Sequence, residues 1–92
     1  MIALANEPIS IEQARVNITH AGLNGELPET VFYRSDKEQI RAWVTEALRT
    51  GSIPGIPEDP RADIADYSIE TFDADEATPY NRIFVRPKTV FG

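Results

Sequence analysis

The chain has few of the side chains that usually carry covalent catalysis. His20 is its one histidine, and cysteine is absent, so neither a thiolate nucleophile nor a disulfide is available. A serine nucleophile needs a general base within hydrogen-bond reach. The serines show no histidine at a recognisable spacing: Ser10, Ser35, Ser52 and Ser68. The sequence therefore predicts no nucleophilic site, and we expect His20 to flank a turn.

The carboxylates offer two weak alternatives. Asp73, Asp75 and Glu76 are spaced somewhat like a calcium loop, but such a loop also needs a central glycine and a distant bidentate glutamate. Asp63 and Asp66 could pair for acid–base catalysis, which would require a deep cleft. A glycine-rich phosphate loop is missing as well. We therefore expect a protein that is not an enzyme and has no metal site or cofactor.

Charge is distributed unevenly along the chain. The net charge of −6 disfavours binding to nucleic acid. Residues 57–79 carry eight acidic side chains against Arg61 alone, whereas residues 80–92 carry Arg82, Arg86 and Lys88 and no acid. An acidic loop is most often a solvated surface, but it can also meet a basic partner.

Size and composition predict one small domain. With 92 residues and 41% hydrophobic content, the chain can build one modest core. We expect a single domain over residues 1–92, with residues 1–12 as a lead-in and residues 88–92 as a flexible tail. No signal peptide or membrane span is recognisable, and the absence of cysteine fits the cytoplasm. The oligomeric state is left open.

Residues 35–51 predict the main helix. Ser35 and Glu38 have the spacing of a capping box. Apolar residues then repeat with the period of one helical face, and we expect all of them, the tryptophan included, in the core: Ile40, Trp43, Val44, Ala47 and Leu48. Gly51 is well placed to end the helix.

Four strands are expected around this helix. Residues 14–20 and 30–34 should form a hairpin whose turn is marked by Asn24-Gly25. Residues 64–72 and 82–86 alternate in the same way, with Ile83 and Val85 pointing inward. One helix on one face of a four-stranded mixed sheet would bury both apolar surfaces, which predicts an α+β fold of order β-β-α-β-β.

Three phenylalanines alternate with the inward-facing positions of these strands. Phe32, Phe72 and Phe84 should therefore lie on the sheet face opposite the helix. If that face is uncovered, they form an aromatic patch of the kind that binds partners. The alternative is that residues 1–12 fold over it.

The order of elements and two motifs resemble the β-grasp fold of ubiquitin-like proteins. Arg34-Ser35-Asp36 at the helix entry is similar to Pro-Ser-Asp in ubiquitin. Gly51-Ser52-Ile53-Pro54 and Gly55-Ile56-Pro57 after the helix are similar to its Gly-Ile-Pro exit. The resemblance covers residues 14–57 by order and motif, and the rest of the chain by topology only.

This resemblance implies a protein modifier or carrier, in particular a prokaryotic ubiquitin-like modifier. In that family a partner enzyme adenylates the carboxylate of a C-terminal glycine, a role that would fall on Gly92. Phe91 stands where the family commonly has another glycine, and Arg82, Arg86 and Lys88 resemble the basic residues that guide the tail to conjugating enzymes. The alternative is a non-enzymatic adaptor or immunity-type protein that binds its target through the acidic loop or the open sheet face.

Overall fold

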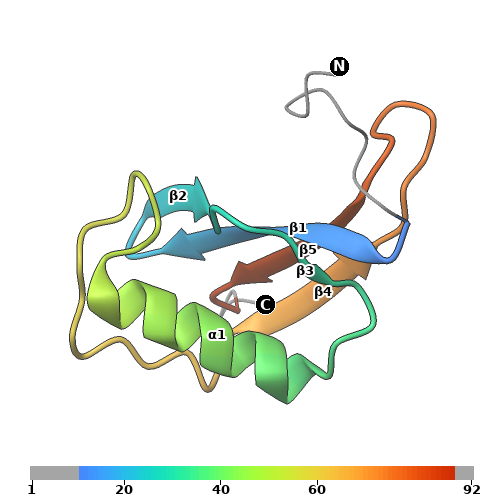
Figure 1. Cartoon of the computed structure of the whole chain (residues 1–92). Coiled ribbons are helices and arrows are strands. Elements are labelled where there is room, and N and C mark those ends of the chain that lie inside the picture. Colours follow the sequence, from blue (N-terminus) through green and yellow to red (C-terminus); the bar gives the residue numbers. More distant parts are fainter. Residues whose placement is uncertain (1–10, 89–92) are drawn as a thin grey trace.

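A computed structural model describes residues 11–88, which form one helix and five strands (Figure 1). The elements are β1 (Gln13–His20), β2 (Leu23–Glu26), β3 (Val31–Phe32), α1 (Lys37–Thr50), β4 (Ser68–Phe72) and β5 (Asn81–Arg86). The expected lead-in over residues 1–12 and tail over residues 88–92 lie almost entirely outside the described residues.

All five strands belong to one mixed sheet. Its order is β2-β1-β5-β4, and β3 pairs with β1 on the same side as β2. The central strands β1 and β5 run parallel, and every other pairing is antiparallel. Helix α1 lies across one face of this sheet (Figure 1). The predicted α+β class, with a mixed sheet and one helix, is confirmed.

The core lies between α1 and the sheet. Strand β1 alternates strictly between partly exposed and buried positions, which is the pattern of a strand with one buried face. Its inward residues meet those of β5 and α1, all of them fully or almost fully buried: Ala14, Val16, Ile18, Ile40, Val44, Leu48, Ile83 and Val85. Burying one such aliphatic side chain larger than alanine contributes roughly 1.5–3 kcal/mol.

The first hairpin turns earlier than the sequence predicts. His20 pairs with Leu23, so the turn consists of Ala21 (φ 53°) and Gly22 (φ 81°). Two successive positive φ angles define the turn that fits the twist of a two-residue hairpin. The predicted turn at Asn24-Gly25 is therefore wrong, and these two residues lie inside β2.

Gly25 is needed for packing rather than for turning. A Cβ atom at this position would lie 2.6 Å from the carbonyl oxygen of Pro54 and 2.8 Å from the Cγ2 of Ile53. The segment that follows α1 can therefore close against β2 only because residue 25 has no side chain.

The second half of the predicted hairpin is interrupted, which gives five strands instead of four. Asn17 pairs with Glu26 and Ala14 with Val31, so three steps along β1 correspond to five along its partner. The extra residues surround Pro28, which has no N–H to donate to a ladder. The predicted strand 30–34 is thereby reduced to Val31–Phe32.

Helix α1 begins without the predicted capping box. Its N-cap is Asp36, which makes no side-chain capping bond, while the hydroxyl of Ser35 donates instead to the carbonyl oxygen of Phe32 at 2.6 Å. The predicted C-terminal end is correct. Gly51 has φ 71°, and the Ser52 N–H donates to the Ala47 carbonyl at 2.9 Å, which closes the last turn.

Trp43 is not in the core as predicted. It is 42% exposed, whereas the other apolar residues of its helical face are buried. Trp43 lines a groove at the interrupted β2–β3 edge, together with Val31 and Phe32 of the two-residue strand β3.

The long connector between α1 and β4 is ordered by helix arginines. Arg41 Nη1 donates to the carbonyls of Ile64 (2.7 Å) and Tyr67 (3.0 Å), and Arg49 Nε donates to the carbonyl of Ala62 (2.9 Å). The Tyr67 N–H bonds to Ile64 in a turn, so β4 starts at Ser68 and not at the predicted residue 64. Within residues 11–88, no helix is long and apolar enough to cross a membrane.

Candidate partner-binding face

The sheet face opposite α1 brings arginines and phenylalanines of β1, β4 and β5 together. In the register, Arg82 lies between Arg15 on β1 and Phe72 on β4, and Phe84 lies opposite Glu70. Residues paired across strands point to the same side of a sheet. We call the resulting surface the arginine–phenylalanine face, which consists of Arg15, Glu70, Phe72, Arg82, Phe84 and Arg86.

The two phenylalanines of this face are in contact. The ring centroids of Phe72 and Phe84 are 5.1 Å apart at an interplanar angle of 45°. This distance and tilt are typical of a favourable aromatic pair. Phe72 remains 40% exposed and Phe84 is partly buried, so the pair exposes apolar surface to solvent.

Each arginine of this face stacks on an aromatic ring. The guanidinium carbon lies 5.7 Å from the Phe72 centroid for Arg82, 5.1 Å from the Phe84 centroid for Arg86, and 5.4 Å from the Tyr80 centroid for Arg15. A cation over a ring face within about 6 Å is attracted by the ring quadrupole. The rings therefore help to hold the guanidinium groups against the sheet.

Local acids only partly neutralise these arginines. Arg82 Nη2 donates to the carbonyl of Asp73 at 3.2 Å and lies 3.8 Å from the carboxylate of Asp75. Arg86 Nη2 donates to Glu70 at 3.4 Å across two half-exposed side chains, an ion pair that solvent screens strongly. The Nε of Arg82 is buried and has no hydrogen-bond partner within residues 11–88.

The predicted site residues separate into three groups. Phe72, Phe84, Arg82 and Arg86 come together on the arginine–phenylalanine face. Phe32, which is 48% exposed, belongs to the opposite edge of the sheet, where it lines a groove with Trp43. The exposed Lys88 follows β5 directly, while Phe91 and Gly92 lie outside the described residues.

Arg15 is a member of this face that the sequence did not indicate, and its guanidinium lies over Tyr80, which the sequence did not single out either. Arg15 joins because β1 and β5 pair in parallel, which sets residues almost seventy positions apart side by side. Its alternation with buried Ala14 and Val16 was the available signal for its face, but nothing in the sequence indicates its neighbour across the sheet.

Several acids of the 57–79 segment shape loops. Asp73 accepts a hydrogen bond from the Tyr33 hydroxyl at 2.7 Å, and Asp75 accepts one from the Thr78 N–H at 2.8 Å. Burial, followed by the bond to Asp73, raises the pKa of Tyr33. These contacts tie the β4–β5 loop to the residues after β3. No group of three or more His, Asp or Glu side chains within residues 11–88 is placed to hold a metal ion.

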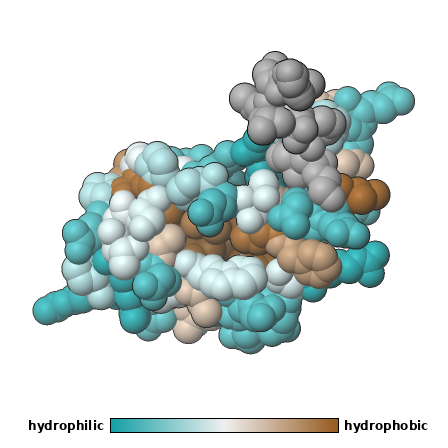
Figure 2. Space-filling view, viewed as in Figure 1, coloured by the Kyte–Doolittle hydropathy of each residue, from teal (hydrophilic) through white to brown (hydrophobic). Residues whose placement is uncertain are grey.

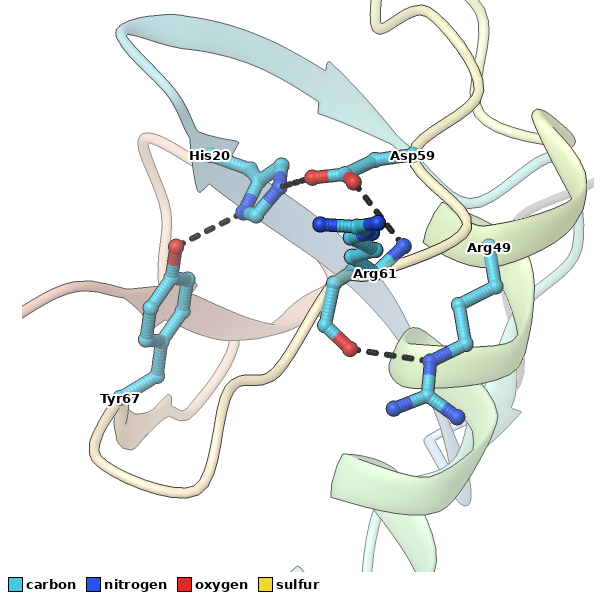
Figure 3. A network of polar contacts seen from close by, with 6 residues as sticks. His20, Arg49, Asp59, Arg61 and Tyr67 are labelled. Atoms are coloured by element: carbon cyan, nitrogen blue, oxygen red, sulfur yellow. Dashed lines mark hydrogen bonds and ion pairs between the residues drawn. The ribbon is translucent and has the colours of Figure 1, made fainter.

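His20 lies at the centre of a second polar cluster (Figure 3). As expected, it ends the strand that enters the hairpin turn, and it is 8% exposed. Its Nδ1 lies 2.7 Å from the Tyr67 hydroxyl and its Nε2 lies 2.8 Å from the Asp59 carboxylate. The bond from His20, then that from the Arg61 N–H, lowers the pKa of Asp59, while burial raises that of Tyr67.

The chemistry of the His20 cluster points to structure rather than catalysis. Both ring nitrogens are engaged, and the imidazole is almost completely covered. The three side chains join the end of β1, the connector and the residue before β4. The cluster therefore fixes the connector onto the sheet.

The chain matches no protein-family model, no curated protein and no solved structure. Its function is therefore inferred from the geometry of its own side chains.

Proposed function

We propose that the chain is a non-enzymatic, cytoplasmic protein-binding module with a β-grasp-like fold. The sheet order supports the fold, because a parallel central pair, β1 and β5, is flanked by antiparallel neighbours and covered by one helix. The ubiquitin-like resemblance of residues 14–57 leads to the same arrangement.

The observation that carries the binding function is the arginine–phenylalanine face. Arginine and aromatic residues are enriched among the side chains that dominate the free energy of protein binding. Here the contacting pair Phe72–Phe84 is flanked by guanidiniums that stacking already holds in place, so little side-chain entropy is lost on binding.

The charges of this face define its partner. Arg82 and Arg86 lie over the phenylalanine rings, Arg15 pairs with Arg82, and Glu70 is the acid among them, whereas the chain as a whole carries a net charge of −6. The fitting partner surface has an apolar centre bordered by carboxylates, which can accept hydrogen bonds from the arginines. Nucleic acid fits less well, because the net charge repels it and the guanidiniums already occupy the rings.

The test compares two exposed phenylalanines at opposite edges of the sheet. Proteins captured by the immobilised wild-type chain are purified singly and titrated against Phe72→Ser and the matched control Phe32→Ser. We expect Phe72→Ser to weaken binding about tenfold or more, the usual loss at an aromatic hot spot, and Phe32→Ser to leave it within about twofold. Equal affinities for wild type and Phe72→Ser would reject this face as the binding site.

A second candidate function is that of a modifier conjugated through Gly92. It is favoured by the position of β5, a central strand that leads through Arg86 and the exposed Lys88 into the last residues of the chain. Incubation with ATP and a ubiquitin-type activating enzyme should then produce an adenylate or thioester adduct visible by mass spectrometry. An unchanged mass, or full function after deletion of Gly92, would remove this candidate.

A further inference from the structure

An apolar groove lies at the edge of the sheet farthest from β4, away from the Phe72–Phe84 pair of the arginine–phenylalanine face. It has a volume of about 650 Å³ and runs between α1 and the β2–β3 edge, where Figure 2 shows apolar surface in a hollow. Its apolar lining consists of Leu27, Pro28, Val31, Phe32, Trp43 and Ala47. Two large aromatic side chains that are nearly half exposed on one groove are unusual unless something covers them.

The charges at the groove are all of one sign. Glu29 and Glu46 are the charged residues that line it, and both are exposed. The remaining polar lining consists of hydroxyl groups: Thr30, Thr50 and Ser52. The groove therefore suits a segment that combines apolar side chains with a lysine or arginine next to them.

The last residues of this chain have that composition. Lys88 precedes Thr89, and the apolar pair Val90-Phe91 follows, with no acid anywhere in residues 80–92. We propose that residues 88–92 of a second copy dock in this groove, with Phe91 against Trp43 and Phe32 and with Lys88 near Glu29 and Glu46. This inference does not depend on the proposed function.

The position of β5 favours a second copy over the chain's own tail. Val85 pairs with Ile18, so the chain leaves the sheet near the hairpin end of β1, whereas Val31 of the groove pairs with Ala14 at the start of β1. The groove also lies beyond β1 as seen from β5, because β1 separates β5 from β2 and β3. Residues 87–92 span at most about 20 Å when fully extended, which leaves little length for a path across the sheet.

The contact would be heterologous, because tail and groove are different surfaces. Such contacts add copies head to tail rather than closing a symmetric dimer. A docked segment of five residues makes a small interface, so we expect weak, concentration-dependent association.

Two full-length variants separate the two halves of the contact. Phe91→Ser removes the aromatic side chain of the tail and leaves the groove intact. Trp43→Ala removes the aromatic wall of the groove and leaves the tail intact. Trp43 is the one tryptophan of the chain, so in a mixture all tryptophan emission comes from the intact groove of the Phe91→Ser copy. We expect each variant alone to sediment as a monomer, and their mixture to form a 1:1 complex with blue-shifted Trp43 emission.

Charge exchange provides an independent test if Trp43→Ala folds poorly. Glu46→Lys and Lys88→Glu should each weaken self-association of the full chain about fivefold, a typical scale for a rim ion pair turned into a repulsion, and a mixture of the two should restore it. Phe72→Ser, which alters β4 at the other edge of the sheet, is the control and should associate like wild type.

Three results would overturn the proposal. Mixing could produce no complex and no shift in emission. Trp43 emission could be independent of concentration yet change with Phe91→Ser, which would place the chain's own tail in the groove. Emission could instead respond to deletion of residues 1–10 and not to Phe91→Ser, which would assign the groove to the N-terminal segment.

Discussion

Substituting Gly25 by alanine tests how the connector closes on the sheet. The added Cβ would meet the Pro54 carbonyl oxygen at 2.6 Å and the Ile53 Cγ2 at 2.8 Å. Real Cβ atoms essentially never approach other atoms below 3.0 Å, and one of the two neighbours is backbone, so a rotamer change cannot relieve the contact. Either β2 or the connector must move.

The cost follows from overpacking in a closely packed interior. Inserting a methyl group without space typically costs 1–3 kcal/mol, and 1 kcal/mol shifts the Tm of a domain of this size by roughly 4–8 °C. We therefore expect Gly25→Ala to lower Tm by about 5–20 °C. The matched control is Glu26→Ala, an exposed neighbour on the same strand, which should change stability by less than about 0.5 kcal/mol.

Thermal unfolding followed by circular dichroism measures both variants, and a crystal or NMR structure of Gly25→Ala would show which segment moves. A Tm within about 2 °C of wild type would refute the reasoning, because it would mean that the connector does not approach β2 as described.

Three further outcomes follow from the same contacts. Ala21→Asn should raise stability by a few tenths to about 1 kcal/mol in urea unfolding, because asparagine tolerates φ 53° better than alanine; a loss would argue against the turn at residues 21–22. The bond from His20 lowers the pKa of Asp59 in the folded chain below its unfolded pKa of about 3.8. This bond therefore stabilises the fold above the unfolded pKa, and its contribution disappears as pH falls through the lower folded pKa. Asp59→Asn should therefore lessen the fall in Tm between about pH 4 and pH 2, and parallel curves would contradict this. Arg41→Met should lower the free energy of unfolding by about 1–3 kcal/mol, because it leaves the carbonyls of Ile64 and Tyr67 without their shared charged donor. Unchanged unfolding in guanidinium chloride would show that Arg41 does not hold the connector in place.

The sequence predicted the helix and strands correctly where the signal depends only on residues close together in the chain. The spacing of Ile40, Val44 and Leu48 identified the buried helix face, and Gly51 identified its end. Alternation identified β1 and β5, including inward Ile83 and Val85. These signals succeed because helix and strand periodicity depend only on neighbouring residues.

The errors arise where tertiary contacts decided the outcome. Asn24-Gly25 is a strong turn signal, but its glycine is explained by the approach of Pro54 from a distant segment. Trp43 belongs to the apolar helix face by spacing, yet it borders the groove at the β2–β3 edge and remains 42% exposed. Neither contact is visible in the local sequence.

The candidate face was predicted only in part for the same reason. Alternation placed Phe72 and Phe84 on one side of their strands, but the approach of Arg15 depends on the parallel pairing of β1 with β5. Alternation also assigned Phe32 to the same patch, but it gives no strand order. In the sheet, β3 and β4 lie at opposite edges, so Phe32 is separated from Phe72.

The most direct measurement is an NMR cross-saturation experiment on the isotopically labelled chain bound to a captured and purified partner. Our account predicts attenuation of amide signals in β4 and β5, centred on Phe72, Arg82 and Phe84, with little effect on α1. Attenuation confined to α1 and the β2–β3 edge, with β4 and β5 unaffected, would contradict the arginine–phenylalanine face as the binding surface.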